Sequence, residues 1–248
     1  MNHVFYKAVV DSTNLWAKEE GDAGAAHGSV YVADMQTAGR GRRGRAWQSP
    51  AGENLYFSLL LRPDFAPDKA SMLTLVMAMA VTEGVRSYGG DARIKWPNDI
   101  VLNGRKLCGI LTEMHLGAGG AYSVIVGVGV NVKQKDFAPE ITDMATSLLK
   151  ELNIEVDKEE LLERILKSFE EFYQEFTSRG DFHLLLARYN DILINRGNYV
   201  KVLDPKGEFI GIARGINAQG ELLVEKEDGE TVAIYAGEVS VRGLYGYT

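Results

Sequence analysis

The chain has 248 residues, of which 46% are hydrophobic and 25% are charged, and its formal net charge is -7. This length and composition indicate a folded globular protein with one large core, or with one large and one small domain. A protein whose main task is to hold nucleic acid needs a broad basic surface, and the acidic balance argues against that class.

Cysteine content and hydropathy bear on where the protein works. Cys108 is the only cysteine, which excludes an intrachain disulfide and a cysteine-based metal cage and suits a reducing compartment. The opening residues, MNHVFYKAVVDSTN, lack the basic and apolar regions of a secretion signal. No run of about eighteen apolar residues occurs, so no membrane span is expected. We therefore expect a cytoplasmic protein with no membrane partner.

Strands and helices are predicted in blocks along the first part of the chain. Apolar and aromatic density predicts strands at residues 3–10, 28–37 and 54–62. Between the first two, DSTNLWAKEE at 11–20 begins with small polar residues that suit a helix N-cap. Residues 68–90 have the Ala, Met and Leu content and the closing glycine pair of a core helix.

Three further strands are predicted at 92–96, 106–116 and 121–132, separated by Gly-rich or Asn-rich turns. The clearest helix lies at 158–180, where one apolar face stands opposite acidic residues. Such blocks favour the α+β class, with a mixed sheet and helices on one face.

The pattern of apolar runs and turn residues changes near residue 195. Short β-rich runs are separated there by DPKGE, NAQGE and KEDGE, which is typical of a small antiparallel barrel. We therefore divide the chain into a domain at 1–194 and a second domain at 195–248.

QTAGRGRRGRAW, residues 36–47, concentrates four arginines and three glycines in seven consecutive positions. Glycines let backbone N–H groups fold around an anion, while arginines reach it with forked donors. Because neighbouring guanidinium groups repel one another, we expect the loop to be mobile until an anion orders it. The spacing matches neither a P-loop nor a dinucleotide fingerprint. A phosphate loop, a solvated loop and an RNA-contacting loop all stay open, although no aromatic residues are interleaved with the arginines.

IKWPNDI, residues 94–100, is the second unusual stretch. A proline and an Asn-Asp pair after a strand suit a turn that presents oxygen atoms. Lys95 is suited to neutralise a phosphate, Trp96 to pack a flat ligand, and Asp99 to hold Mg²⁺ together with phosphate oxygens. The alternative is an ordinary hairpin turn with a structural tryptophan.

Three further features each have a structural and a functional interpretation. DSTN at 11–14 is an N-cap or a set of hydrogen-bonding groups for a small polar ligand. Arg105 and Lys106 are a solvated strand end or a cationic site. Gly127 and Gly129 alternate through an apolar strand, either to pack against a helix or to admit something close to the backbone. The four histidines lack metal-ligand spacing, and no motif indicates a covalent nucleophile.

Taken in order, DSTN, QTAGRGRRGRAW, KWPNDI, GRKLCGIL and GVGVN resemble the catalytic domain of biotin protein ligases, also called biotin–[acetyl-CoA-carboxylase] ligases. The tail from GIARGINAQGELLVE to GEVSVR is similar to the SH3-like C-terminal domain of that family. The resemblance implies a sheet of the class II aminoacyl-tRNA synthetase and biotin ligase type. Cys108 stands where the family often has alanine or another small residue.

The resemblance also implies residue roles. Biotin would be bound by Ser12, Thr13, Asn14, Gln36, Arg40, Gly41, Arg42 and Lys106. The nucleotide would be bound by Arg42, Arg43, Arg45, Trp47, Lys95 and Asn131. The catalytic groups would be Lys106, Arg40, Arg42 and Asp99, with Asp99 also as the Mg²⁺ ligand.

The implied function is activation of biotin by ATP to biotinyl-5'-AMP, then transfer of biotin to a lysine of a biotin carboxyl carrier protein domain. ATP and Mg²⁺ would be required. Some family members carry a DNA-binding domain ahead of this one, and because only ten residues precede DSTN we expect no DNA partner. The alternatives are a lipoate-type protein ligase and a noncatalytic RNA-binding module that uses the Arg/Gly loop. The sequence leaves open the acceptor carboxylase, a monomer or homodimer, and whether Asp99 is a general base or only supports charge.

Overall fold

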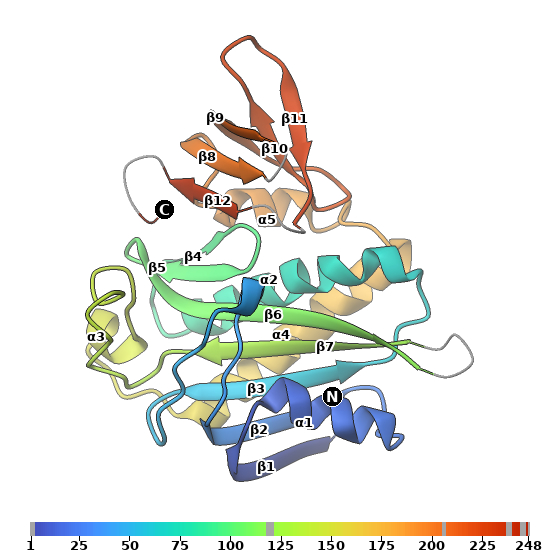
Figure 1. Ribbon diagram of the computed structural model, residues 1–248, viewed down its shortest axis with the longest axis vertical. Helices are drawn as coiled ribbons and strands as arrows, with labels where there is room; N and C mark the ends of the chain where they lie inside the picture. Colours follow the sequence, from blue (N-terminus) through green and yellow to red (C-terminus); the bar gives the residue numbers. More distant parts are fainter. Residues whose placement is uncertain (1–2, 118–121, 205–206, 237–239, 244–246, 248) are drawn as a thin grey trace.

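A mixed seven-stranded sheet forms the centre of the larger part of the molecule (Figure 1). The computed structural model describes residues 3–117, 122–204, 207–236, 240–243 and 247. The strands lie in the order β1-β2-β3-β7-β6-β5-β4, and only β1 and β2 pair in parallel. Their bounds are β1 (His3–Val10), β2 (Ser29–Gln36), β3 (Leu55–Leu61), β4 (Ala92–Lys95), β5 (Asp99–Leu102), β6 (Arg105–Leu116) and β7 (Tyr122–Val130).

Two long helices, α2 (Leu73–Arg86) and α4 (Lys158–Arg179), cover one face of this sheet and pack against each other. Strand residues of alternating position, such as Val126 and Val128, point toward them and form the main core. The short helix α1 (Thr13–Asp22) lies on the opposite face, where Trp16 packs on β2 and β3 (Figure 1). The sheet therefore has a face sealed by the core and a face that α1 covers only in part.

Helix α4 forms as its sequence pattern predicted. Asp157 accepts hydrogen bonds from the backbone N–H groups of Glu159 and Glu160, which caps the first turn. Gly180 ends the helix at a φ of 68°, in the left-handed region that favours glycine. The predicted apolar face is buried, including Leu161, Ile165, Phe169 and Phe176.

A five-stranded antiparallel sheet follows, above the first sheet in Figure 1. Its order is β11-β10-β9-β8-β12, from strands β8 (Tyr199–Asp204), β9 (Gly207–Ile216), β10 (Leu222–Glu225), β11 (Thr231–Ile234) and β12 (Ser240–Gly243). The buried Trp96 ties the two sheets together, since its indole N–H donates to the carbonyl of Gly220 at 3.1 Å. The predicted α+β class with a small β domain is confirmed, whereas the division at residue 194 stays a prediction.

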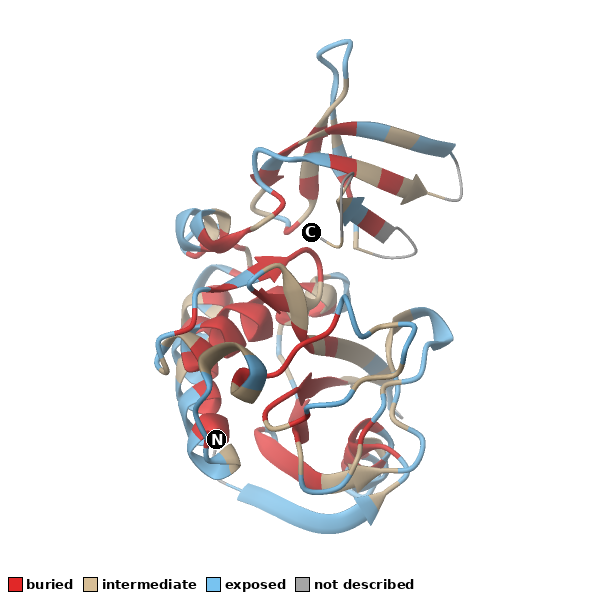
Figure 2. Ribbon diagram, turned by 90° about the vertical axis from the view of Figure 1, so that its left-hand side faces the viewer, coloured by how far each residue is buried: buried red, intermediate tan, exposed pale blue. Residues whose placement is uncertain are grey.

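Smaller elements connect these layers. The sequence did not indicate α3 (Leu148–Leu152) or α5 (Leu186–Ile192), which are too short to show a clear helical period. Two 3-10 turns, η1 (Arg42–Gly44) and η2 (Pro67–Met72), lie in the loops before β3 and α2. Edge strand β1 is exposed along almost its whole length (Figure 2). Within the described residues no helix is long and apolar enough to cross a membrane.

Candidate active site

The partly covered face of the large sheet gathers most of the side chains that the sequence singled out. Gly127 and Gly129 lie on this face of β7, and both lack space for a side chain. A Cβ on Gly127 would lie 2.0 Å from Asn14 Oδ1, and one on Gly129 would lie 2.4 Å from Trp47 Nε1. Gly127 therefore lets helix α1 pack close to β7, which is the first of the two interpretations, whereas Gly129 admits a loop side chain close to the backbone, which is the second.

A polar cluster surrounds the start of α1. Thr13 donates to Gln36 Oε1 through its backbone N–H at 2.9 Å and through its hydroxyl at 3.2 Å. The hydroxyl of Ser58 contacts Thr13 Oγ1 at 2.8 Å and Asn14 Oδ1 at 2.6 Å. Ser12 is the N-cap residue, but its hydroxyl makes no capping hydrogen bond. Because Ser12, Thr13 and Asn14 are all nearly buried, the fold holds a set of small polar groups in fixed positions.

Two residues of this cluster were not foreseen from the sequence. Ser58 lies inside an apolar strand, and only the alternation of strand faces points it toward Thr13. Glu113 accepts from Asn14 Nδ2 at 2.9 Å and pairs with Arg40 at 2.9 Å between Nη2 and Oε1. Ser58 could have been found as a lone polar residue in an apolar strand. No pattern in the sequence singled out Glu113.

The Arg/Gly loop forms a tight hairpin over this face. Arg40 and Ala46 pair as an antiparallel bridge, and Gly41 N–H donates to the Arg45 carbonyl at 2.7 Å. Arg43 adopts a φ of 59°, a region that non-glycine residues rarely occupy. The side chains of Arg43 and Arg45 are exposed, so the structure does not bring them into the polar cluster.

Arg42 points inward and joins the two sheets. Its guanidinium donates to Asn98 Oδ1 at 3.0 Å and to the carbonyl of Ala236 at 2.7 Å. Burial lowers the pKa of Arg42, while the Asp99 carboxylate partly offsets that effect. Arg42 is thus held between the KWPND turn and the C-terminal sheet.

A charged cluster lies where β4, β5 and β6 meet. Lys106 Nζ is 2.6 Å from Asp99 Oδ1, and the backbone of Lys95 lies opposite that of Asp99 in the β4–β5 register. Burial by itself would raise the pKa of Asp99, but the charge and hydrogen bond of Lys106 hold it below its ordinary value. Burial lowers the pKa of Lys95 to about 8. Asp99 is therefore an anion that lies among cations.

Trp96 and Asn131 have structural partners. Trp96 is buried, and its backbone N–H donates to Asn195 Oδ1 at 2.9 Å, which favours the structural tryptophan over a flat-ligand platform. Asn131 is buried beside the end of β7 and donates to the Thr146 carbonyl at 2.9 Å. Trp47 lies with its ring 5.4 Å from Lys106 Nζ, and its buried indole N–H has no partner among the described residues.

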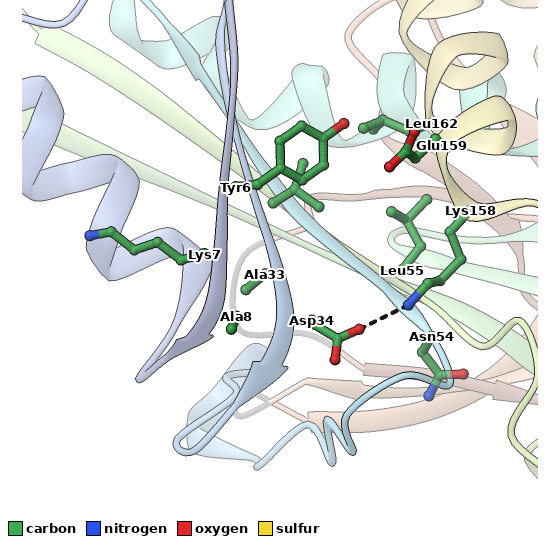
Figure 3. A pocket seen from close by; sticks show the side chains of 11 residues that line it. Tyr6, Lys7, Ala8, Ala33, Asp34, Asn54, Leu55, Lys158, Glu159 and Leu162 are labelled. Atoms are coloured by element: carbon green, nitrogen blue, oxygen red, sulfur yellow. Dashed lines mark hydrogen bonds and ion pairs between the residues drawn. The ribbon is translucent and has the colours of Figure 1, made fainter.

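A groove of about 540 Å³ runs along residues 35–39 and 46–50, beside Gln36 and Trp47. A second cavity, of about 310 Å³, lies on the other face between β1, β2, β3 and the first turns of α4 (Figure 3). None of the predicted site residues lines that second cavity. The groove is therefore the one that adjoins the polar cluster.

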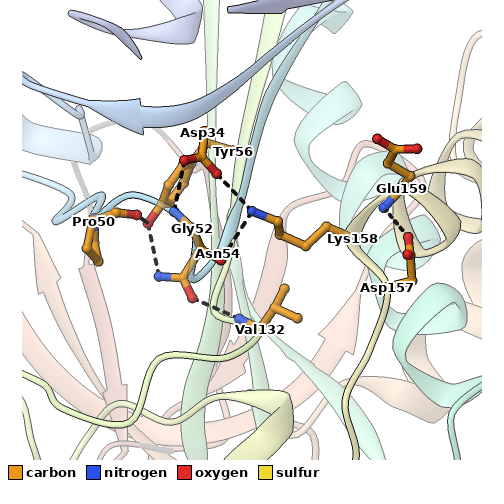
Figure 4. A network of polar contacts seen from close by, with 9 residues as sticks. All are labelled: Asp34, Pro50, Gly52, Asn54, Tyr56, Val132, Asp157, Lys158 and Glu159. Atoms are coloured by element: carbon orange, nitrogen blue, oxygen red, sulfur yellow. Dashed lines mark hydrogen bonds and ion pairs between the residues drawn. The ribbon is translucent and has the colours of Figure 1, made fainter. Parts of the chain in front are cut away.

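A polar network anchors the segment after the loop (Figure 4). Asp34 accepts from Gly52 N–H at 3.0 Å and pairs with Lys158 of α4 at 3.0 Å. Asn54 donates to Tyr56 at 3.0 Å and accepts from the Val132 N–H at 2.9 Å. One end of the Arg/Gly loop is thus fixed to α4 and to the end of β7.

No group of three or more His, Cys, Asp or Glu side chains in the described ranges is placed to hold a metal ion. Cys108 is buried, and burial raises the pKa of its thiol, so it is an unreactive core residue. The site therefore offers cations, amides, hydroxyls and the carboxylates of Asp99 and Glu113. Such a set binds anionic and polar groups and needs no nucleophile of its own.

Comparison with known proteins gives consistent matches. Residues 6–131 match the biotin/lipoate A/B protein ligase family, and residues 197–242 match the biotin protein ligase C terminal domain. The bifunctional ligase/repressor BirA of Bacillus spizizenii is 38% identical over 242 residues, which cover 96% of this chain and 74% of that protein. The biotin–[acetyl-CoA-carboxylase] ligase of Paracoccus denitrificans is 35% identical, with 95% and 99% of the two chains covered.

Solved structures agree with this. The biotin protein ligase of Aquifex aeolicus in complex with biotin and ATP superposes with a TM-score of 0.87 at 32% identity, covering 98% of this chain and 100% of that one. Its R40G mutant in complex with biotin gives 0.85 at 32% identity, covering 98% and 99%. The chain therefore belongs to the biotin/lipoate A/B protein ligase family and, with its matching C-terminal domain, to the biotin protein ligases within it.

Proposed function

We propose that this chain joins biotin and ATP to form biotinyl-5'-AMP with release of pyrophosphate, and then transfers biotin to a lysine of a biotin carboxyl carrier protein domain. The observation that carries the proposal is the meeting of the α1 polar cluster, the Arg/Gly loop and the Lys106–Asp99 pair on one sheet face. Relatives named as biotin ligases, and a similar fold solved with biotin and ATP, support it.

In this proposal the site has two ends. The biotin end uses the amides and hydroxyls around α1, together with the hairpin backbone, the exposed Arg40 and the inward Arg42. Its residues are Ser12, Thr13, Asn14, Gln36, Arg40, Gly41 and Arg42. The nucleotide end uses cations of the loop and of the β4–β5 hairpin, together with Trp47 of the loop and Asn131 after β7. Its cations are Arg42, Arg43, Arg45 and Lys95. Lys106 lies where the two ends meet, beside Asp99.

The first step needs alignment and charge neutralisation. A carboxylate is already a nucleophile, so its attack on the α-phosphorus requires no nucleophile from the protein. Negative charge grows on the phosphate oxygens as the bond to pyrophosphate breaks, and fixed cations stabilise that charge. Lys106, Arg40 and Arg42 supply those cations in this proposal. The hairpin would shield the mixed anhydride from water once it has formed.

In the second step a carrier-domain lysine attacks the anhydride carbonyl and AMP leaves. Lys106 and Arg42 would stabilise the departing phosphate. Asp99 is held as an anion by Lys106, so it is suited to support charge. Its role as a general base for the incoming amine remains part of the proposal.

Mg²⁺ belongs to the proposal as well. The ion usually takes one or two carboxylates together with phosphate oxygens, and Asp99 fits the first of these. Both Asp99 oxygens already accept contacts, from Lys106 at 2.6 Å and from Tyr247 at 2.5 Å, so the nucleotide would provide most ligands. When bound, Mg²⁺ would neutralise phosphate charge.

Pyrophosphate exchange into ATP, measured with and without biotin, tests the function. We expect exchange that requires biotin and is not supported by lipoate, followed by labelling of a carrier domain. Exchange with lipoate alone would indicate the lipoate-type ligase instead. Absence of any exchange together with salt-sensitive RNA binding would indicate the RNA-binding alternative. A cytoplasmic location and the lack of a DNA partner stay predictions.

Ligand binding should protect the hairpin from protease. Arg43 and Arg45 are exposed, so trypsin should cut after them in the free protein. Biotin with MgATP should slow that cleavage severalfold, because the product would engage the hairpin. Cleavage after Lys226, in the turn before β11 and far from the site, serves as the internal control. Equal hairpin cleavage in both states would contradict an ordering loop.

ATP binding should take up protons above neutral pH. The pKa of Lys95 is lowered to about 8, so its ammonium begins to lose its proton as the pH rises through 8. Triphosphate oxygens would favour the charged form and raise that pKa. The charge of Asp99 raises the pKa of Lys95, and the charges of Lys106, Arg242 and Arg45 lower it. The ring of Tyr247 lies against the Lys95 ammonium.

We therefore expect ATP affinity to fall between pH 7 and 9, with net proton uptake on binding. Calorimetry in buffers of different ionisation enthalpy measures the uptake. The variant Lys95→Met should bind ATP more weakly and should lose most of the uptake near pH 8. Unchanged uptake in that variant would remove Lys95 from the nucleotide end.

A further inference from the structure

Tyr247 lies against Lys95 of the proposed nucleotide end and against Asp99, although it follows the last strand of the other sheet. Its hydroxyl donates to Asp99 Oδ2 at 2.5 Å. The ammonium of Lys95 sits 3.4 Å from the centre of its ring. Nothing in the sequence motifs pointed to this tyrosine, which stands 148 positions from Asp99.

The surroundings of Tyr247 carry an excess of positive charge. The charge of Asp99 raises the pKa of Lys95. The positive charges of Lys106, Arg242 and Arg45 lower the pKa of Lys95. Within the described ranges Lys95 forms no ion pair, and its ammonium lies against the face of the Tyr247 ring. An aromatic ring attracts a cation less strongly than a phosphate does, so this ammonium is better matched to an anion than to the ring.

The phenol also remains a neutral donor. Burial raises the pKa of Tyr247, and the adjacent Asp99 carboxylate raises it further. A neutral hydroxyl satisfies one Asp99 oxygen while Lys106 satisfies the other. The ring and the hydroxyl of Tyr247 thus occupy positions beside Lys95 and Asp99 that would change when a nucleotide binds.

We propose that Tyr247 is an internal competitor for the nucleotide: its ring covers Lys95 until the phosphates of ATP displace it, and its hydroxyl meanwhile holds Asp99. The inference rests on the proposed assignment of Lys95 to the nucleotide end and of Asp99 to the catalytic groups. Two contacts must be broken before ATP can use these residues, so the apparent affinity for ATP is weaker than the cationic cluster alone would give. The contrary role is a positioning residue that stays in place and helps hold the nucleotide.

Direct binding separates the two roles without using ligase activity. The dissociation constant of MgATP is measured by calorimetry, in the absence of biotin, for the wild-type protein, Tyr247→Phe and Tyr247→Ala. The Phe variant removes only the hydrogen bond, and the Ala variant removes both contacts. We expect MgATP to bind about tenfold more tightly to Tyr247→Ala, with a smaller gain for Tyr247→Phe. Tyr199→Ala, which alters an exposed tyrosine of β8, should leave the constant unchanged.

Unchanged or weaker MgATP binding by both Tyr247 variants would overturn the competitor role. Thermal unfolding of each variant shows whether the fold is kept, and Tyr247→Phe keeps the ring packing if Tyr247→Ala does not fold. Biotin-dependent pyrophosphate exchange by the wild-type protein is measured in parallel. Failure of that exchange would count against the proposed function, whereas normal exchange with unchanged variant affinities would count against this inference alone.

Discussion

Replacing Lys106 with alanine is expected to lower single-turnover formation of biotinyl-5'-AMP about 100- to 1000-fold. The ammonium of Lys106 lies 2.6 Å from Asp99 and close to the Trp47 ring, at the junction of the two ends of the site. Losing a preorganised charge beside the reacting phosphate removes roughly 2.7 to 4 kcal/mol of transition-state stabilisation. Quenched-flow measurement of the adenylate with excess enzyme isolates this step from transfer.

The same change leaves Asp99 without its ion-pair partner, so the protein should also become less stable. Both side chains are partly buried, and removing one member of such a pair costs more than removing both, because the remaining charge is less well compensated. We therefore expect Lys106→Ala/Asp99→Asn to unfold at a higher temperature than Lys106→Ala, yet to stay inactive. Lys201→Ala, which breaks an exposed pair with Glu208 in the second sheet, is the matched control. Near-normal adenylation by Lys106→Ala would exclude Lys106 from the site.

Replacing Arg42 with glycine is expected to release the adenylate more than it impairs its synthesis. Arg42 holds Asn98 and the Ala236 carbonyl, and so links the hairpin to the β4–β5 turn and to the second sheet. Without it the hairpin loses its inward anchor, while Lys106 and Arg40 remain to support the attack. A lost charge-assisted hydrogen bond is worth about 1.5 to 3 kcal/mol, or roughly one to two powers of ten in the dissociation constant.

The escaped anhydride should then acylate exposed lysines on bystander proteins. Wild-type protein, Arg42→Gly and the surface control Arg196→Gly are incubated with biotin, MgATP and serum albumin, and labelling of albumin is compared with labelling of a carrier domain. Arg196 lies in the turn before β8 and pairs with Asp191 at 3.4 Å, so its loss should change neither label. An Arg42→Gly protein that makes adenylate but labels albumin no more than wild type would show that Arg42 is not a clamp.

Much of this molecule follows from short-range patterns in the sequence. Helical periodicity fixes the buried face of α4, because residues three and four positions apart share one side of a helix. Alternation along a strand places Gly127 and Gly129 on one face of β7, and the Arg/Gly loop is visible as composition alone. These features depend on neighbours in the chain, so they can be read before the fold is known.

The composition of the site depends on contacts between residues far apart in the sequence. Glu113 meets Asn14 across 99 positions, and Tyr247 meets Asp99 across 148. Strand order and register decide which face of the sheet Glu113 and Asp99 occupy, since a shift of one residue would turn each side chain to the other face. Trp96 is a further case that local sequence could not decide. The sequence around it allowed a platform for a flat ligand, and only its burial and its hydrogen bond to the Gly220 carbonyl show that it has a structural role. Local periodicity thus determined the elements and their faces, while the packing of the two sheets decided which polar side chains share the site.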